Sequence, residues 1–397
     1  MHDPLGSGTI LGYCTNVHAG ESFGEMRANL ERFALPVKRR VCADRPMGVG
    51  LWFSNRALRE VGDGGRAADL RGWLEGRGLL AYTLNGFPFG DFHEAVVKAR
   101  VYEPHWADDA RLEHTLGLAK LLAELLPDGA GEGSISTLPI GWPASFCGTA
   151  EGFETQAERA ADRLMRLVHG LARLELDTGK HIHVCLEPEP GCVLETAAGA
   201  VGFFERYLLG GPDDESVRSY LRVCHDVCHS AVMFEPQADA VETYRDAGIG
   251  IGKVQLSSAL RVDFDASDTA AREEARRKLA SFDEPRYLHQ TSVRLDDGRV
   301  NSYVDLGDAL ADPAWEDRIH GEWRVHFHVP VFAEAMGPLS TTRHEIGELL
   351  GSLGEGEVQH FEAETYAWDV LPKAEQADDL SAGIAEELGW LLQEFGR

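Results

Sequence analysis

The sequence predicts an α/β fold, a single (β/α)8 barrel. Apolar, strand-like segments alternate with helical patterns from one end of the chain to the other, which is typical of parallel α/β architecture. Eight such strands fit a closed barrel, and no Gly-rich dinucleotide-binding motif follows the first strand, which argues against an open doubly wound sheet. The chain has 397 residues, 44% of them hydrophobic. Barrels of this size commonly fold as one domain, so we expect a single domain over residues 1–397.

The elements follow from the pattern of apolar residues. The eight expected strands are Ile10–His18, Val49–Phe53, Leu79–Gly86, Ser134–Leu138, Ile182–Pro188, Leu221–His229, Ile249–Ser257 and Phe361–Tyr366. The clearest helical patterns between them are Ala110–Leu126, Thr155–Leu176 and Ala197–Leu208. In the first of these helices, apolar residues recur at spacings of three and four, at Leu112, Leu116, Ala119 and Ala123.

A ninth strand-like segment, Trp323–Phe332, exceeds the count for a barrel. We place it in a long insertion, Ser258–Pro338, between the seventh strand and the helix Thr341–Leu353. The same insertion contains a predicted hairpin, Tyr287–Val293 and Arg299–Val304. A connection that leaves the end of a barrel strand lies at the C-terminal face, where the active sites of barrels are built. We therefore expect the insertion to form a lid or a wall over that mouth.

Composition and charge restrict the function. The net charge is −27, and a field of that sign repels phosphate backbones, so we expect no nucleic-acid partner. No apolar run is long enough to span a membrane, and Met1 to Gly8 lacks the features of a secretory signal. The seven cysteines are an odd number, which suits reduced thiols in a cytoplasmic protein. For Cys224 and Cys228 we favour small core residues over a zinc site. The sequence allows a homo-oligomer.

Four oxygen-bearing side chains fall at the C-terminal ends of expected strands. Glu187 ends the fifth, Asp226 lies in the sixth after an apolar run, Gln255 lies late in the seventh, and Glu364 ends the eighth. A lone carboxylate at the end of a buried strand costs several kcal/mol or more. Convergent carboxylates repel one another unless a cation lies between them, although pairing with arginines is the alternative. Hard oxygen donors select Mn²⁺ or Mg²⁺.

These strand ends resemble a known superfamily. The motifs Glu187-Pro-Glu-Pro-Gly, Asp226-Val-Cys-His229 and Glu364-Thr-Tyr are similar to the metal-binding strand ends of the xylose-isomerase-like TIM barrels, which include ketose epimerases, dehydratases and endonuclease IV. Many members carry His where this chain has Gln255, but some dehydratases use Gln. By the same resemblance, His229 and Arg261 match residues that hold the substrate in the epimerases.

A closer resemblance extends over most of the chain. Four segments look like the EboE-type metabolite-traffic proteins: Leu11-Gly-Tyr-Cys-Thr-Asn-Val-His18, Asn85-Gly-Phe-Pro-Phe-Gly-Asp-Phe-His93, Lys253-Val-Gln-Leu-Ser-Ser258 and Arg324-Val-His-Phe-His-Val-Pro330. The gene neighbourhood of that family implies a cyclitol-like or sugar-like metabolite, without specifying a reaction.

Several further residues are candidates for the same mouth. His18, Asn85 and His93 lie at or just past the first and third strands, as substrate or metal contacts or as ordinary buried residues. His326 and His328 alternate along the chain and so share one face. In endonuclease IV an Asp-x-His pair at the corresponding place helps to hold further zinc ions. Here His326, His328 and His229 could bind a second metal, Zn²⁺ or Fe²⁺, or instead position substrate oxygens.

Lys253 lies two residues before Gln255, on the same strand face and one layer deeper. We expect it to form a buried ion pair with Glu362, which lies below Glu364 in the same way, rather than to act as a Schiff-base lysine. Glu189 and Glu195 are expected at the rim.

Three functions remain open. The first is a metal-dependent isomerase, epimerase or dehydratase of a small polyhydroxylated metabolite, in which Glu187 or Glu364 takes a proton while His229 and Arg261 hold the oxygens. The second is a hydrolase of a phosphate ester that uses several metal ions, along the lines of endonuclease IV. The third is a binding protein that carries a metabolite without turnover, since a barrel alone does not establish catalysis.

Overall fold

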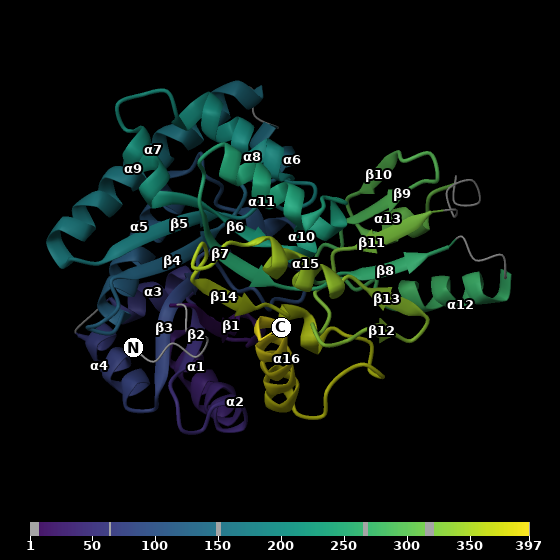
Figure 1. The fold of residues 1–397 in the computed structure, drawn as a ribbon, viewed down its shortest axis with the longest axis horizontal. Helices are drawn as coiled ribbons and strands as arrows, with labels where there is room; N and C mark the ends of the chain where they lie inside the picture. The colour runs from purple at the N-terminus through teal and green to yellow at the C-terminus, as the bar shows by residue number, and fades with distance from the viewer. Residues whose placement is uncertain (1–7, 63–64, 148–151, 265–268, 314–320, 397) are drawn as a thin grey trace.

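The computed structural model describes residues 8–62, 65–147, 152–264, 269–313 and 321–396. Its main feature is an eight-stranded parallel sheet with the order β1-β14-β7-β6-β5-β4-β3-β2. A parallel bridge between Cys14 and Gly50 brings the two edges together, so the sheet is a nearly closed barrel (Figure 1). The strands are β1 (Ile10–Tyr13), β2 (Met47–Trp52), β3 (Leu79–Asn85), β4 (Glu132–Thr137), β5 (His181–Leu186), β6 (Leu221–Asp226), β7 (Ile251–Leu256) and β14 (His360–Ala363). Each expected barrel strand is present, which confirms the predicted fold.

Helices follow the strands and cover the outside of the barrel. They are α1 (Phe23–Asn29), α2 (Leu35–Val41), α3 (Asn55–Val61), α4 (Arg66–Glu75), α5 (Asp109–Leu125), α6 (Pro143–Cys147), α7 (Gly152–Thr178), α8 (Ala197–Phe203), α9 (Asp214–Tyr220), α10 (Val227–Val232), α11 (Gln237–Asp246), α15 (His344–Ser352) and α16 (Leu380–Phe395). Short 3-10 and π-helical turns are η1 (Thr15–Val17), η2 (Leu30–Ala34), η3 (Lys98–Tyr102), η4 (Phe204–Leu208) and η5 (Tyr366–Asp369). The predicted helices correspond to α5, to α7 and to α8 continued by η4.

The long helix α7 shows why the helical pattern is reliable here. Its buried residues include Ala157, Ala160, Ala161, Leu164, Leu167, Val168 and Leu171, at spacings of three and four. They form one apolar face against the barrel, while the opposite face is polar. No helix within the described ranges is both long enough and apolar enough to cross a membrane.

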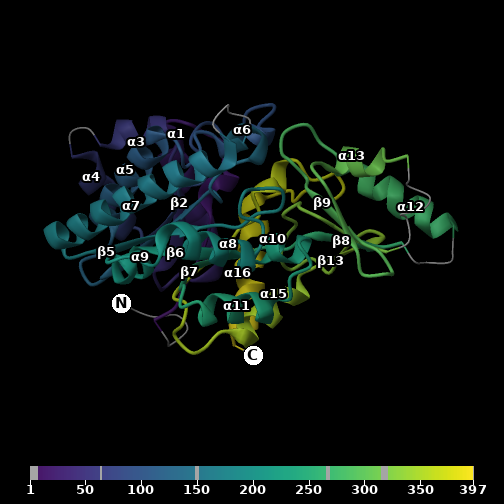
Figure 2. The ribbon, with the colours of Figure 1, turned by 90° about the horizontal axis from the view of Figure 1, so that it is seen from above.

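The predicted insertion contains a second sheet. Its strands are β8 (Leu260–Asp263), β9 (Thr291–Arg294), β10 (Val300–Tyr303), β11 (Glu322–Val325), β12 (Ala335–Met336) and β13 (Leu339–Thr341), accompanied by α12 (Thr269–Ala280) and α13 (Leu306–Leu310). The order is β10-β9-β11-β8-β13-β12, and neighbours are antiparallel. This sheet lies to one side of the barrel in both views (Figures 1 and 2). Residues 265–268 and 314–320 of the insertion lie outside the described part.

The expected hairpin is confirmed as β9 and β10, in which Val300 pairs with Arg294 and Tyr303 with Thr291. The expected ninth strand is only half right. The strand β11 ends at Val325, and residues 326–330 continue without regular structure. Their backbone bonds go to separate places, because His326 N donates to the carbonyl of Gln290 and Val329 N to that of Ser258.

The interior of the barrel contains an ion pair in place of a purely apolar layer. Lys253 and Glu362 are both fully buried and form the predicted pair, and the ammonium group also donates to Ser136 Oγ at 3.2 Å. The strand β2 makes room for this pair, because a Cβ on Gly50 would lie 1.1 Å from Oε1 of Glu362. A glycine is therefore required at position 50 while the pair is in place.

Candidate metal centre at the C-terminal mouth

The four predicted strand-end residues meet at one mouth of the barrel. Asp226 is the last residue of β6, Gln255 is next to last in β7, and Glu187 and Glu364 directly follow β5 and β14. Asp226 and Gln255 are paired across neighbouring strands. All four side chains are buried. Carboxylate oxygens of Glu187, Asp226 and Glu364 lie within 4.8 Å of one another.

Some polar atoms of this group make no hydrogen bond. Others are held in one orientation by hydrogen bonds from neighbouring residues. Oε2 of Glu187, Oδ2 of Asp226 and both amide atoms of Gln255 are buried without a hydrogen-bond partner. The other oxygen of Asp226, Oδ1, accepts hydrogen bonds from the backbone N–H of His229 at 2.9 Å and from Ser257 Oγ at 2.8 Å.

Glu364 is oriented by two amide groups. Its Oε1 accepts hydrogen bonds from Nδ2 of Asn16 at 2.8 Å and from Nδ2 of Asn85 at 3.0 Å. Buried polar atoms without a partner are costly, so the unpaired oxygens of Glu187, Asp226 and Gln255 beside the carboxylate of Glu364 fit a bound cation. The donor set is all oxygen, which suits a hard divalent ion.

The electrostatics of the group point the same way. Burial, with the neighbouring carboxylates of Glu364 and Asp226, raises the pKa of Glu187 well above its usual value. Burial and Asp226 raise the pKa of Glu364 to about 8. For Asp226 burial acts upward, but the imidazoles of His229 and His328 and the hydrogen bonds from His229 N–H and Ser257 together outweigh it, and its pKa is lowered. These carboxylates compete for protons in the absence of a cation, and a divalent ion would relieve that competition.

Three histidines at this mouth present the same ring nitrogen to the cavity. Nδ1 of His229 donates to the carbonyl of Pro188 at 2.9 Å, and Nδ1 of His328 donates to the carbonyl of Glu364 at 2.7 Å. Nδ1 of His326 lies 2.7 Å from Oε1 of Gln290. A carbonyl oxygen only accepts, so in each neutral ring the proton is on Nδ1 and Nε2 carries a lone pair.

The lone pairs face one another. Nε2 of His229 lies 3.2 Å from Nε2 of His326, and Nε2 of His328 has no hydrogen-bond partner. Burial lowers the pKa of all three rings, to about 4 for His229, which keeps them neutral near pH 7. Two opposed lone pairs repel one another unless a cation or a proton lies between them. Ligand atoms of Asp226, His229 and His328 also lie within 4.8 Å of one another, which is a second place that a metal ion fits.

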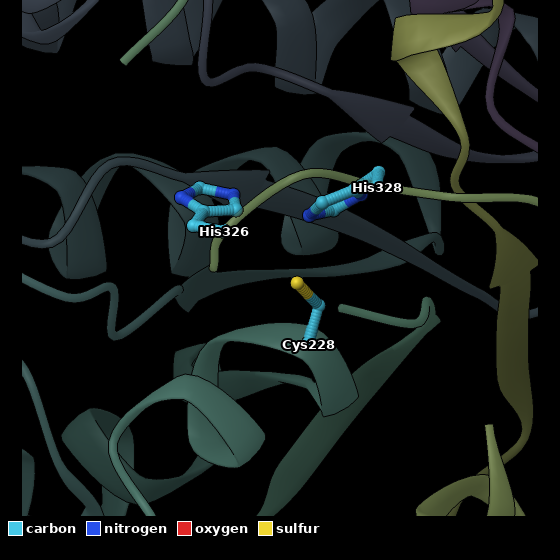
Figure 3. A group of neighbouring side chains, drawn as sticks. All are labelled: Cys228, His326 and His328. Atoms are coloured by element: carbon cyan, nitrogen blue, oxygen red, sulfur yellow. The ribbon is translucent and has the colours of Figure 1, made fainter. Parts of the chain in front are cut away.

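Cys228 lies beneath this histidine group. Figure 3 shows its sulfur, from α10, directed toward the segment that carries His326 and His328. The three side chains offer ligand atoms within 4.8 Å of one another, and burial raises the pKa of the thiol well above its usual value. Among the described residues, no potential metal-ligand group contains both Cys224 and Cys228.

The cavity above the metal-ligand group is small and largely aromatic. It has a volume of about 60 Å³, and Glu187, His229, His328 and Glu364 are among the residues that line it. Its aromatic walls are Phe87, Phe92, Tyr102, Tyr287 and Tyr366. Of the described lining residues only Lys98 is cationic, and its ammonium group is paired with Asp305.

Glu189 and Asn16 belong to the site although the sequence did not single them out as central. Glu189, expected at the rim, is buried and accepts a hydrogen bond from Tyr102 Oη at 2.7 Å and one from Gln290 Nε2 at 3.1 Å. Burial raises its pKa to about 7. Glu195 is exposed and accepts from Gly191 N, as expected for the rim. Asn16 lies in the turn η1, and only its contact with Glu364 identifies it.

The remaining candidates are placed differently. Arg261, on β8, pairs with Glu322 at 2.9 Å within the second sheet and does not line the cavity. His18 is buried, 3.0 Å from Tyr13 Oη and stacked on Phe33, away from the cavity. Nε2 of His93 bonds to the carbonyl of Asn16 at 2.7 Å, so it supports the site without lining it.

Comparisons with known proteins identify the fold. No protein-family model matches the chain, and no curated protein matches it. Among solved structures, a xylose isomerase-like TIM barrel protein from Mycobacterium smegmatis, in complex with magnesium, is 12% identical, covers 100% of this chain and 98% of its own, and has a TM-score of 0.51. The probable 3-DHS dehydratase AsbF from Bacillus anthracis is 13% identical, with coverages of 97% and 98% and a TM-score of 0.48. The fold is that of a xylose-isomerase-like TIM barrel.

Proposed function

We propose that this protein is a divalent-metal-dependent enzyme that isomerises, epimerises or dehydrates a small polyhydroxylated metabolite. The observation that carries the proposal is the convergence of the carboxylates of Glu187, Asp226 and Glu364 at one mouth. Glu187, Asp226 and the neighbouring Gln255 have buried polar atoms without a partner. These four residues would hold Mn²⁺ or Mg²⁺. The magnesium complex of the Mycobacterium smegmatis protein, which shares the fold, supports the choice of ion class.

The reaction that fits this site begins with the removal of a proton from carbon. A divalent ion held by these four residues would supply Lewis acidity toward the substrate. Glu364 or Glu187 accepts the proton, since both carboxylates line the cavity in which the substrate would bind. Asn16 and Asn85 fix the orientation of Glu364. The fate of the proton then distinguishes an epimer, an isomer and a dehydration product.

The other residues assigned from the resemblance divide into two groups. His229 lines the cavity and is available to hold a substrate oxygen. Arg261 is engaged with Glu322, so we assign it to the second sheet rather than to the substrate. If that sheet closes over the mouth as the predicted lid, it would exclude water from the reaction.

The walls of the cavity favour a neutral, ring-shaped substrate. Aromatic faces pack against the C–H faces of a sugar or cyclitol ring. The one cationic side chain among the described lining residues is already paired, so a phosphate group would find little compensation. Such a substrate agrees with the resemblance to the EboE-type metabolite-traffic proteins.

A second candidate function rests on a different observation. The 3.2 Å approach of two imidazole nitrogens, with a third unpaired nearby, favours an additional ion such as Zn²⁺. Several metal ions in one site are typical of enzymes that hydrolyse phosphate esters. More than one zinc per chain, together with cleavage of a small phosphate ester, would support this function over the first.

The experiment that tests the first proposal detects proton transfer without knowledge of the product. The Mn²⁺-loaded protein is incubated in D₂O with a panel of ketoses, inososes and related cyclitols, and deuterium incorporation is measured by NMR. We expect exchange in at least one compound. The variant Glu364→Gln should lose about 100-fold or more of that exchange. The exposed Glu195→Gln serves as a matched control that should retain it.

Two outcomes would reject the assignment. Full metal content and full exchange in Glu364→Gln would remove this residue from the mechanism. Tight binding of a panel compound with no exchange and no product would instead support a protein that carries the metabolite without turnover.

A further inference from the structure

A second group of potential metal ligands lies at the opposite end of the barrel. Glu132 begins β4, and His181 and His183 lie at the start of β5. A carboxylate oxygen of Glu132 and one ring nitrogen of each histidine lie within 4.8 Å of one another. Parallel strands begin at the N-terminal mouth, so this group is separate from the strand-end carboxylates described above.

The environment of His183 favours a cation in this group. The side chain is 1% exposed, and its Nε2 donates to the carbonyl of Gly252 at 3.1 Å. In the neutral ring Nδ1 therefore carries a lone pair. That atom lies 3.0 Å from Oε1 of Glu132, with no hydrogen bond between them. A lone pair that faces a carboxylate oxygen at this distance is repelled unless a proton or a metal ion lies between the two.

The strand opposite is adapted to this position of the ring. A Cβ on Gly252 would lie 2.6 Å from both Cδ2 and Nε2 of His183, so no larger residue fits beside it.

His181 and Glu132 are held by outer contacts of the kind that support metal ligands. Nδ1 of His181 donates to Oε2 of Glu175 at 2.6 Å, and Tyr220 Oη donates to the same oxygen at 2.8 Å. That bond leaves Nε2 of His181 as its ligand atom, in a carboxylate–histidine–metal arrangement. Arg222 Nη1 donates to Oε1 of Glu132 at 2.8 Å and keeps that carboxylate in place.

The charges leave room for a divalent ion. Two carboxylates, Glu132 and Glu175, surround the group, and the guanidinium group of Arg222 offsets one of them. One net negative charge therefore remains before an ion binds. Two imidazoles and one carboxylate are ligands that zinc prefers.

The group borders a cavity through which an ion can enter. This cavity, of about 370 Å³, is lined by Glu132, His181 and His360 among others. It is larger than the cavity at the C-terminal mouth. Three protein ligands beside an open space leave a coordination position for water or a small ligand.

We propose that Glu132, His181 and His183 form a zinc site at the N-terminal mouth of the barrel, with its fourth position open to the adjacent cavity. The site ties the starts of β4 and β5 together through a shared ion. It is independent of the proposed reaction, because none of its ligands contributes to the opposite mouth.

Crystals of the full chain grown with Zn²⁺ test the site directly. An anomalous difference map measured at the zinc edge should show a peak among the three side chains, with ligand distances of about 2.0–2.2 Å. A crystal with full zinc at the other mouth and no peak here would overturn this inference alone. A peak here with none at the other mouth would leave it standing and contradict the proposed metal centre.

Solution stoichiometry provides the second measurement. The half-buried His181→Gln should lose one equivalent of zinc per chain by elemental analysis, and Glu132→Gln should do the same. His169→Gln is the matched control, because that histidine is exposed on α7 and lies 3.6 Å from Asp213. Equal zinc content in all three variants and the wild type would mean that His183 and Glu132 form only an ion pair. If His181→Gln does not fold, Glu132→Gln and the map still decide.

Discussion

Replacing Lys253 with methionine tests the ion pair inside the barrel. Methionine is similar in length and keeps the apolar stem of the side chain, so the substitution removes the charge with little change in packing. What remains is the carboxylate of Glu362, fully buried and without its cation. The hydrogen bond from the lysine ammonium to Ser136 Oγ, 3.2 Å long, would also be lost in this variant.

The expected cost follows from that burial. Removing one partner of a buried ion pair destabilises a protein by about 3–5 kcal/mol, because an uncompensated charge is left behind. For a chain of 397 residues, an unfolding entropy of about 2.1 cal/mol/K per residue means that a loss of about 4 kcal/mol lowers Tm by about 5 °C. This shift is readily measured by calorimetry or by circular dichroism.

The double variant Lys253→Met/Glu362→Gln isolates the cause. Removing both charges removes the buried unpaired carboxylate, so the double variant should be more stable than the single one by about 2 kcal/mol or more. Lys120→Met, on the exposed side of α5, is the control and should change stability by less than about 0.5 kcal/mol. Equal losses in the single and double variants would refute the reasoning, since packing rather than charge would then set the cost.

Three further predictions concern titration and packing. His114 is buried, both ring nitrogens lack hydrogen-bond partners, and burial lowers its pKa to about 3. The unfolded chain binds a proton at His114 below about pH 6.5, so stability is lost as pH falls from about 6.5 toward 3. The variant His114→Leu should abolish about 2 kcal/mol of the loss between pH 7 and pH 5, measured by urea titration. The same dependence of unfolding free energy on pH in the variant and the wild type would contradict this. Metal binding near pH 7 should release a proton from Glu364, because its pKa of about 8 keeps it mostly protonated without an ion. At pH 9 the release should be smaller. Calorimetric titrations in buffers of different ionisation enthalpy measure the number of protons released, and binding heats that do not depend on the buffer would argue against the site. Gly50→Ala places a methyl group 1.1 Å from Oε1 of Glu362 and should destabilise the chain by about 3–5 kcal/mol. The control Gly72→Ala in α4 has nothing within 4 Å of the added methyl group and should leave Tm unchanged. The same Tm for the two variants would contradict this prediction.

The sequence predicted the barrel because its physical signal is local. Buried parallel strands are short apolar runs, and the helices between them show a period near 3.6. The prediction of a ninth strand is only half right, also because the signal is local. Trp323–Phe332 alternates polar and apolar side chains as a strand does, but beyond Val325 its backbone bonds go to Gln290 and Ser258 rather than to a ladder. A pattern of side chains does not report where the backbone finds its partners.

The metal-ligand residues were predictable for an electrostatic reason, and their supporting residues were not. A carboxylate at the end of an apolar strand is anomalous in any sequence, so Glu187 and Glu364 were evident. Asn16 and Glu189 act through contacts with residues far away in the chain, such as the bond from Asn16 to Glu364. Arg261 was assigned to the substrate by the resemblance to the epimerases, but the register of β8 and β11 places it beside Glu322 instead.

The two kinds of metal ligand at the C-terminal mouth come from different parts of the chain. The oxygen donors lie at the ends of barrel strands, whereas His326 and His328 follow β11 of the second sheet. Nδ1 of His328 fastens this segment to the barrel by donating to the carbonyl of Glu364. Any displacement of that segment would withdraw His326 and His328 and leave His229, on α10, and the oxygen ligands in position. The nitrogen content of the coordination sphere, read by spectroscopy of a bound paramagnetic ion, would therefore report directly on whether the mouth is open or closed.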